Sequence, residues 1–199
     1  MTIDKYGAGQ DPYCYPGTDV LRNHLGLKDA LLLQEAERDL SRIAAAEIEF
    51  QPPPYGRGYL RTLHKQLFQD LYDWAGECRS VDISKDTTRF CTASRIIPEG
   101  NKLFAQMERA GWYEGQPREA VIPALAEVFG ELNMVHPFRE GNGRAQRLLF
   151  DHLIINLGLE INWWSATADE WIQANISAVH CDYSPLARIF SRCIGGSID

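Results

Sequence analysis

Two long helical segments, separated by a stretch that no helix can contain, limit the possible folds of this chain most strongly. Residues 118–135 and 144–158 are rich in apolar and helix-forming residues, and each predicts a helix. Between them, Pro137 disfavours helical backbone geometry at His136, so the first helix should end near the histidine. Glycines follow within a few residues and permit unusual backbone angles. The sequence therefore predicts two consecutive helices joined by a short irregular loop.

Helical patterns recur along the rest of the chain. From Leu60 to Trp74, apolar residues are spaced as on one face of a helix, and Gly76 is the expected stop. The prolines at 52–54 end the preceding helix. The fold class that we expect is all-α, with about seven helices and one short β-hairpin. The predicted helical segments are 28–50, 60–76, 101–111, 118–135, 144–158, 167–179 and 184–193.

The predicted hairpin comes from a segment with a different period. Val81 and Ile83 alternate with the polar Ser80, Asp82 and Ser84, which is the pattern of a half-buried strand. The polar sequence SKDTT that follows is a suitable turn. This segment should therefore form a short β-hairpin.

Length, charge and cysteine content narrow the class of protein. A chain of 199 residues is long enough for one domain with a substantial core. The net charge of −7 argues against a nucleic-acid surface, and no apolar run is long enough to span a bilayer. The N-terminus lacks the apolar segment of a secretory signal, and the five cysteines contain no C-x-x-C spacing. We expect a cytoplasmic protein with free thiols, with no membrane contact and no direct nucleic-acid contact.

The loop HPFREGNGRAQR has the composition of an anion site. Gly141 and Gly143 lie just before a new helix, whose first amides lack intrahelical partners and carry partial positive charge. Phosphate is the usual occupant of such a turn. Arg144 and Arg147 are three residues apart, hence on one helix face, and their guanidinium groups suit phosphate oxygens. Taken alone, the sequence GNG more often marks a tight turn, and paired arginines are usually a solvated face.

Two further groups of this loop suit chemistry on a phosphate. Glu140 could hold Mg²⁺, which commonly binds one carboxylate and shares its other ligands with substrate phosphates. His136 is largely neutral at pH 7 and could accept the proton of an attacking hydroxyl. Phe138 between them would hold the loop against the core. His136 and Glu140 could instead bind zinc, although no third ligand appears at a helical spacing.

With these residues in place, the chain resembles the Fic family of AMP-transferases, whose motif is H-x-F-x-[DE]-G-N-G-R-x-x-R. The similarity continues upstream through LHKQLFQDLYDWAGECRSVDISK and extends from about Leu60 to the last helix. It implies a mostly helical Fic fold with a hairpin called the flap, and one Fic domain over 1–199. Within it, 1–57 would be an N-terminal arm and first helix, and 58–195 the catalytic core. The matching residues are His136, Phe138, Glu140, Gly141, Asn142, Gly143, Arg144 and Arg147.

The resemblance implies transfer of AMP from ATP to a Tyr, Ser or Thr hydroxyl of a target protein, with release of pyrophosphate. His136 would be the catalytic base, and Glu140 would hold Mg²⁺ bridging the α- and β-phosphates. Asn142 and the flanking glycine amides would bind the α-phosphate. Arg144 and Arg147 would stabilise the leaving phosphates.

The resemblance also gives roles to segments outside the motif. The hairpin from Ser80 to Phe90 would pair with a target segment by adding a strand, while a plain hairpin packed over the core is the alternative. Residues 85–87 of this hairpin, which are Lys85, Asp86 and Thr87, would border the nucleotide. Trp171 is a candidate for the adenine pocket, although a core tryptophan is the simpler interpretation.

Many Fic proteins are inhibited by a helix with the motif [ST]-x-x-x-E-[GN], which this chain lacks. Its three Glu-Gly pairs begin at Glu99, Glu114 and Glu140, and none has Ser or Thr four residues earlier. The resemblance therefore implies a bacterial toxin restrained by a separate small antitoxin, whose helix would dock near Arg147 and the first helix of the chain. DNA gyrase and topoisomerase IV are the targets that the resemblance suggests.

Three other activities stay open. A kinase in the same fold would bind ATP in a flipped orientation, but relatives of that kind carry lysine where this chain has Gly143. Phosphocholine transfer also occurs in the family, but no residue here points to it. A non-catalytic module could use the anion site to bind a nucleotide or a phosphorylated protein, although binding alone requires neither a base nor a metal carboxylate.

Overall fold

The chain forms a mostly helical domain, which confirms the expected fold class. This computed structural model describes residues 11–85 and 88–198. No helix in that part of the chain is both long and apolar enough to cross a membrane. Short 3₁₀ turns at Ala93–Arg95, Gly111–Tyr113 and Trp163–Ser165 connect some of the helices. The helices are α1 Ala30–Glu47, α2 Arg57–Phe68, α3 Ile96–Arg109, α4 Arg118–Val135, α5 Asn142–Asn156, α6 Ala168–Val179 and α7 Ser184–Cys193.

Two antiparallel strand pairs accompany the helices. The predicted hairpin is present as β1 (Ser84–Lys85) and β2 (Thr88–Arg89), with Ser84 opposite Arg89. A second pair, β3 (Leu159–Ile161) with β4 (Ile194–Ser197), was not predicted. β4 contains two glycines, which have low strand propensity, so only its pairing with the distant β3 makes it a strand.

The predicted helix ending at Gly76 is shorter than expected. α2 ends at Phe68, and a series of tight turns follows, in which the amides of Leu71 and Tyr72 both donate to the carbonyl of Phe68. Leu71 and Tyr72 are almost fully buried in this turn. Their burial continues the apolar spacing of α2 by tertiary packing, so the periodicity suggested a longer helix than the backbone forms.

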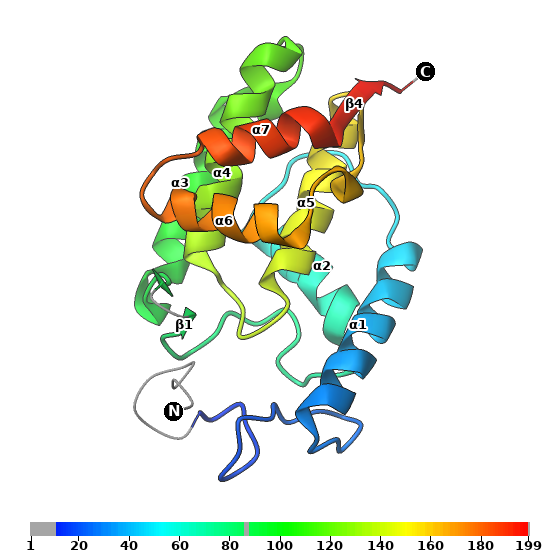
Figure 1. Cartoon of the computed structure of the whole chain (residues 1–199), viewed down its shortest axis with the longest axis vertical. Helices are drawn as coiled ribbons and strands as arrows, with labels where there is room; N and C mark the ends of the chain where they lie inside the picture. The colour runs from blue at the N-terminus through cyan, green and yellow to red at the C-terminus, as the bar shows by residue number, and fades with distance from the viewer. Residues whose placement is uncertain (1–10, 86–87, 199) are drawn as a thin grey trace.

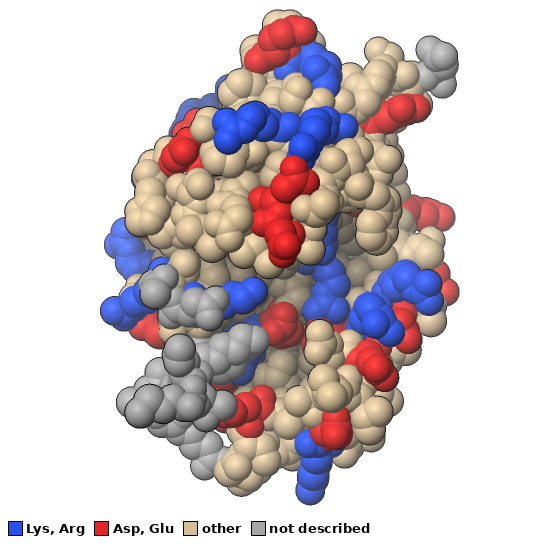
Figure 2. Space-filling view, viewed as in Figure 1, with Lys and Arg blue, Asp and Glu red and all other residues tan. Residues whose placement is uncertain are grey.

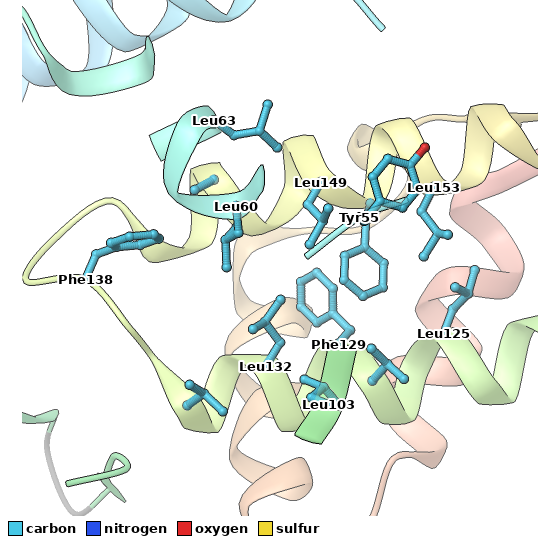
Figure 3. Close-up of a cluster of buried hydrophobic side chains, with 14 of the residues drawn as sticks. Tyr55, Leu60, Leu63, Leu103, Leu125, Phe129, Leu132, Phe138, Leu149 and Leu153 are labelled. Carbon is cyan, nitrogen blue, oxygen red and sulfur yellow. The ribbon is translucent and has the colours of Figure 1, made fainter. Parts of the chain in front are cut away.

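α4 and α5 lie in the middle of the molecule, with α6 and α7 on one side and α1 and α2 on the other (Figure 1). Leu125 on α4 and Leu149 and Leu153 on α5 are completely buried. Figure 3 shows these side chains meeting in one cluster, with Phe138 reaching into it toward Leu60 from the loop between α4 and α5. The apolar faces of both helices thus fix the two ends of this loop.

An N-terminal arm runs along the same end of the molecule as the loop (Figure 1). The amide of His24 donates to the carbonyl of Leu71, in the turn that follows α2. Arg139, within the loop, forms a buried ion pair with Asp11 of the arm at 2.6 Å. The arm therefore stabilises the loop that carries the sequence motif.

Candidate active site

His136 lies at the end of α4, where its backbone is left-handed with φ 45° and ψ 62°. Its amide still donates to the carbonyl of Leu132 at 3.1 Å, and Pro137 prevents the helix from continuing. The ring nitrogen Nδ1 is 3.0 Å from the carbonyl oxygen of Asn133. Because a carbonyl can only accept, Nδ1 carries the proton and Nε2 keeps a free lone pair. His136 therefore has the tautomer that a general base needs.

The surroundings of His136 keep its ring neutral. Burial is the largest cause and lowers its pKa from 6.5 to about 4, and the charges of Arg79 and Lys85 act in the same direction. Glu140 and the hydrogen bond to Asn133 oppose this shift. The ring of Phe90, which follows β2, stacks on the imidazole with centroids 3.8 Å apart. The imidazole is thus unprotonated at neutral pH.

Asn142 holds the loop after His136 in shape. Its Oδ1 accepts from the amide of Phe138 and its Nδ2 donates to the carbonyl of the same residue, each at 2.8 Å. Both polar atoms of this amide side chain are therefore engaged within the loop, and the residue is buried. The Asn142 side chain closes the loop, so its contribution to an anion site would come from its backbone amide.

The ring of His64 on α2 holds the loop through hydrogen bonds at both of its nitrogens. Its Nδ1 accepts from the amide of Gly76 and its Nε2 donates to the carbonyl of Glu140, each at 2.9 Å. The ring also stacks on Phe138, with centroids 3.8 Å apart. Burial lowers the pKa of His64 to about 4, so this bridge stays neutral at physiological pH. His64 thereby fixes the backbone from which the Glu140 side chain extends.

Gly141 makes a turn at the start of α5 that no other residue fits. Its φ is +77°, and a Cβ there would lie 2.3 Å from Cε2 and 2.4 Å from Cζ of the buried Phe68 ring. Its amide donates to Oε1 of Glu140 at 3.0 Å. The amides of Asn142 and Gly143 have no acceptor among the described residues, because the helix has only just begun. These two amides form the anion cradle at the helix N-terminus.

Arg144 is held by helix α1. Its guanidinium forms an ion pair with Glu37 and donates to Ser41 Oγ at 3.1 Å, and it lies over the Phe68 ring. The other oxygen of the Glu37 carboxylate accepts from the hydroxyl of Tyr72. Arg144 therefore links α1 to α5 and places its charge at one edge of the cradle.

Arg147 is the arginine available to an anion. Burial lowers its pKa, and the nearby charge of Arg144 acts in the same direction. Within the described chain it forms no ion pair, although Asp151 is close enough to influence it. One of its terminal nitrogens is 3.9 Å from the position that a Cβ of Gly143 would occupy. A desolvated guanidinium beside two unpaired amides favours a bound phosphate.

Glu140 is the carboxylate nearest the cradle. Its side chain is about one-third exposed, and its Oε1 is 4.0 Å from Arg144. Among the described residues, no three His, Cys, Asp or Glu side chains gather where they could hold a metal ion. The donor set fits Mg²⁺, which accepts one protein carboxylate when a substrate supplies phosphate oxygens and water completes the shell.

The hairpin lies beside His136. Lys85, at the end of β1, is exposed, and its charge reaches His136. Asp86 and Thr87, the other predicted nucleotide neighbours, lie outside the described residues. Figure 2 shows basic and acidic side chains around a hollow below α6, whose surface is largely uncharged apart from the acidic side chains of its first turn.

Comparison with known proteins agrees with this geometry. Residues 55–154 match the model of the Fic/DOC family. The probable protein adenylyltransferase Fic of Escherichia coli K12 is 40% identical over 191 residues, which is 96% of both chains. The protein adenylyltransferase VbhT of Bartonella schoenbuchensis is 31% identical over 94% of this chain and 40% of its own length. The crystal structure of BepC from Bartonella tribocorum with bound AMPPNP has a TM-score of 0.85 and 25% identity, covering 93% of this chain and 97% of that one.

The chain belongs to the Fic/DOC family. Its curated relatives are named protein adenylyltransferases, and this confirms the expected enzyme class.

The Fic/DOC motif residues lie together in the loop between α4 and α5 and the first turns of α5, and two of their side chains are engaged within the protein. Asn142 contributes its side chain to the loop, and Arg144 directs its guanidinium to α1. Trp171, the adenine-pocket candidate, packs in an aromatic cluster with Phe129, Trp163 and Phe190. Its ring is partly buried and packs against the core, so its place in an adenine pocket stays a prediction.

Four residues of the site were not found by sequence reasoning. Phe90 stacks on His136, His64 donates to the Glu140 carbonyl, Glu37 pairs with Arg144, and Arg79 donates to the carbonyl of His136. Each acts across a long sequence separation, and none belongs to a local motif. For Glu37, a local signal was its spacing four residues after Leu33, on the face of the helix that is buried.

The protonation of His136 can be followed directly. We expect the ring to titrate near pH 4 in ¹⁵N NMR spectra and to carry its proton on Nδ1 at pH 7. Because the unfolded histidine titrates near about 6.5, the unfolded chain alone takes up this proton as pH falls from there toward 4. The neutral His136 therefore contributes fully to the free energy of unfolding above about pH 6.5, and this contribution is lost as the pH falls toward 4. Lys85→Gln should raise the titration midpoint, and an unchanged midpoint would exclude the proposed influence of Lys85.

The ion pair between Glu37 on α1 and Arg144 on α5 should contribute to the free energy of unfolding. Glu37→Gln removes the charge opposite Arg144 and should lower the free energy of unfolding by about 2 kcal/mol. Glu35→Gln, on the exposed face of the same helix, is the matched control. Urea denaturation measures both variants, and equal midpoints would contradict the importance of the Glu37 contact.

Proposed function

We propose that this enzyme transfers AMP from ATP to a Tyr, Ser or Thr hydroxyl of a target protein and releases pyrophosphate. The observation that carries the proposal is the position of a neutral His136, with its Nε2 lone pair free, next to a helix N-terminus with unpaired amides. The family supports the same activity, since its curated members here are named for it.

In the proposed reaction, Nε2 of His136 takes the proton from the attacking hydroxyl. The hydroxyl oxygen forms a bond to the α-phosphorus, while the bond from that phosphorus to the α,β-bridging oxygen breaks. Pyrophosphate leaves with this bonding pair, and the target keeps AMP on its side chain. The neutral imidazole suits this role because a general base must be unprotonated when substrate binds.

The cradle would hold the triphosphate during this step. The amides of Asn142 and Gly143 would donate to the α-phosphate, where negative charge is favoured by the helix N-terminus. Arg147 would bind the leaving phosphates, with the charge of Arg144 behind it. Mg²⁺ at Glu140 would neutralise part of the phosphate charge. The AMPPNP bound to the similar BepC structure supports a nucleotide of this kind.

The hairpin would orient the target. Residues 84–85 and 88–89 form two very short strands that pair only with each other among the described residues, so an outer edge would be available to a third strand. A target segment paired with this edge would bring its hydroxyl toward His136, which lies beside the hairpin through Phe90. Lys85, Asp86 and Thr87 would border the nucleotide.

Labelled ATP distinguishes this reaction from the alternatives. Label from [α-³²P]ATP should appear on the target, label from [γ-³²P]ATP should not, and mass spectrometry should find an added AMP on a hydroxyl side chain. Transfer of the γ-label would show a kinase instead, and binding without modification would show a non-catalytic module. Gly143 favours the first outcome, since the open cradle carries no lysine to turn the nucleotide around.

We further propose that a separate small antitoxin restrains this enzyme in the cytoplasm. The chain lacks the inhibitory motif, and Arg147 forms no ion pair within the described residues, so a carboxylate from a partner could compete with phosphate for its guanidinium. Leu32 and Ile43 on the outer side of α1 are more than half exposed and would contact such a partner. A neighbouring short reading frame encoding [ST]-x-x-x-E-[GN] would support this regulation. DNA gyrase and topoisomerase IV are the first targets to assay.

A further inference from the structure

Arg79 is a buried arginine whose charge is balanced by carbonyl groups. It lies between the turn at Gly76 and the hairpin, and the whole residue is only 2% exposed. It forms no ion pair within the described chain. The nearby Asp82 instead accepts from Arg89 at 3.1 Å and from the amide of Ala93 at 2.7 Å. A buried charge without a carboxylate is costly, so its other partners must compensate.

The partners of Arg79 come from two separate parts of the site. Nε donates to the carbonyl of His136 at 2.8 Å, and one terminal nitrogen reaches the carbonyl of Val135 at 3.4 Å. The terminal nitrogens also donate to the carbonyl of Val81 at 2.6 Å and to that of Cys91. Val81 precedes β1 and Cys91 follows β2. One guanidinium therefore joins both ends of the hairpin to the last peptides of α4.

Backbone bonds reinforce this junction. The amide of Arg79 donates to the carbonyl of Pro137 at 2.8 Å, and the amide of Cys91 donates to that of Met134 at 2.9 Å. The carbonyls at the end of α4 carry partial negative charge, which favours a cation there. Only a planar guanidinium, whose N–H groups point in several fixed directions, can donate hydrogen bonds to carbonyls on three sides at once. Lysine could keep the charge but could not span them.

This junction determines where the base lies relative to the hairpin. The carbonyl that Arg79 holds belongs to His136 itself, whose left-handed backbone is unusual for a residue with a side chain. Phe90, within the hairpin, stacks on the His136 ring at 3.8 Å and donates its amide to Ile83 at 3.2 Å. A shift of the hairpin would therefore move the ring stacked on the base.

We propose that Arg79 is a positioning residue that fixes the hairpin and the general base in one geometry, so that a target hydroxyl aligned by the hairpin meets Nε2 of His136. This inference rests on the proposed function. Arg79 touches neither the cradle amides nor Arg147, so its loss should impair alignment and leave nucleotide binding intact.

Arg79→Lys tests this role, with Arg118→Lys as its matched control. Arg118 also donates to two carbonyls, those of Ser191 and Ile194, but it lies far from the site in the chain and in its contacts. Hydrogen exchange at the amide of Cys91 should become about tenfold faster in Arg79→Lys and stay unchanged in Arg118→Lys. The ¹⁵N signals of the His136 ring should change only in Arg79→Lys. Hydrogen exchange at amides in the buried part of α5 shows whether a variant has lost stability in general.

The functional measurement separates alignment from binding. With [α-³²P]ATP and purified DNA gyrase, kcat should fall about 10²-fold in Arg79→Lys. The affinity for AMPPNP with Mg²⁺ should stay close to that of the wild type. If Arg79→Lys does not fold, Arg79→Gln, which buries no charge, is measured in the same way.

The outcomes are distinguishable. Normal exchange at Cys91 and normal His136 signals in a folded Arg79 variant would overturn the proposal, as would an equal fall in kcat for Arg118→Lys. If the wild type transfers no AMP to any protein, the proposed function fails, but exchange and ring signals still decide whether Arg79 joins the hairpin to the base.

Discussion

Replacing His136 by alanine is expected to lower AMP transfer by roughly 10³-fold, the usual contribution of a general base. The Nε2 of this neutral ring keeps a lone pair that can accept the proton of an attacking hydroxyl. ATP binding should survive, because the cradle amides and Arg147 do not depend on the imidazole. The rate of label transfer from [α-³²P]ATP measures the first effect, and calorimetry with AMPPNP and Mg²⁺ measures the second.

The control for this prediction is His180→Ala. His180 is exposed and follows α6, with no contact to the loop, so its replacement removes an imidazole without touching the site. A His136→Ala variant as active as His180→Ala would show that another group takes the proton. If His136→Ala instead lost AMPPNP binding, the histidine would belong to the nucleotide site and not to proton transfer.

Replacing Gly141 by alanine is expected to damage both fold and activity. A side chain at φ +77° costs about 1–2 kcal/mol, and overpacking against a buried ring adds a similar amount. The added Cβ would lie 2.3 Å from the nearest Phe68 carbon, and Phe68 is 1% exposed, so its ring has no room to move away. We therefore expect the free energy of unfolding to fall by about 3 kcal/mol. The displaced cradle should also bind AMPPNP poorly.

Gly143→Ala is the matched control for stability. Gly143 lies in the first turn of α5 without a positive φ, and its Cβ would meet only Arg147, at an ordinary 3.9 Å. Alanine has the higher helix propensity, so this variant should be as stable as the wild type or more stable. Urea denaturation of both variants is decisive. A Gly141→Ala variant as stable as Gly143→Ala would mean that Phe68 does not confine the turn.

The hairpin shows where the prediction of secondary structure from apolar periodicity reaches its limit. Alternation over 80–84 predicted a strand, and a hairpin is present, but its strands comprise only two residues each. The chain on either side of them is joined by one backbone bond, from the amide of Phe90 to the carbonyl of Ile83, and by the side chain of Arg79. The apolar spacing through Leu71 likewise suggested a helix, although that residue is buried by a turn. Periodicity reports burial, and burial has more than one structural cause.

The amino-acid sequence alone determined the chemistry of the motif, because its base, carboxylate, glycines and arginines lie within twelve residues and obey local rules. A proline after a histidine ends a helix, a glycine permits a left-handed turn, and a helix start exposes amides. The tertiary structure alone decided which of these groups are engaged. Arg144 meets Glu37 across 107 residues, Glu140 is supported by His64 across 76, and Arg79 reaches His136 across 57. Contacts at such separations leave no periodic trace, since they depend on how whole helices pack.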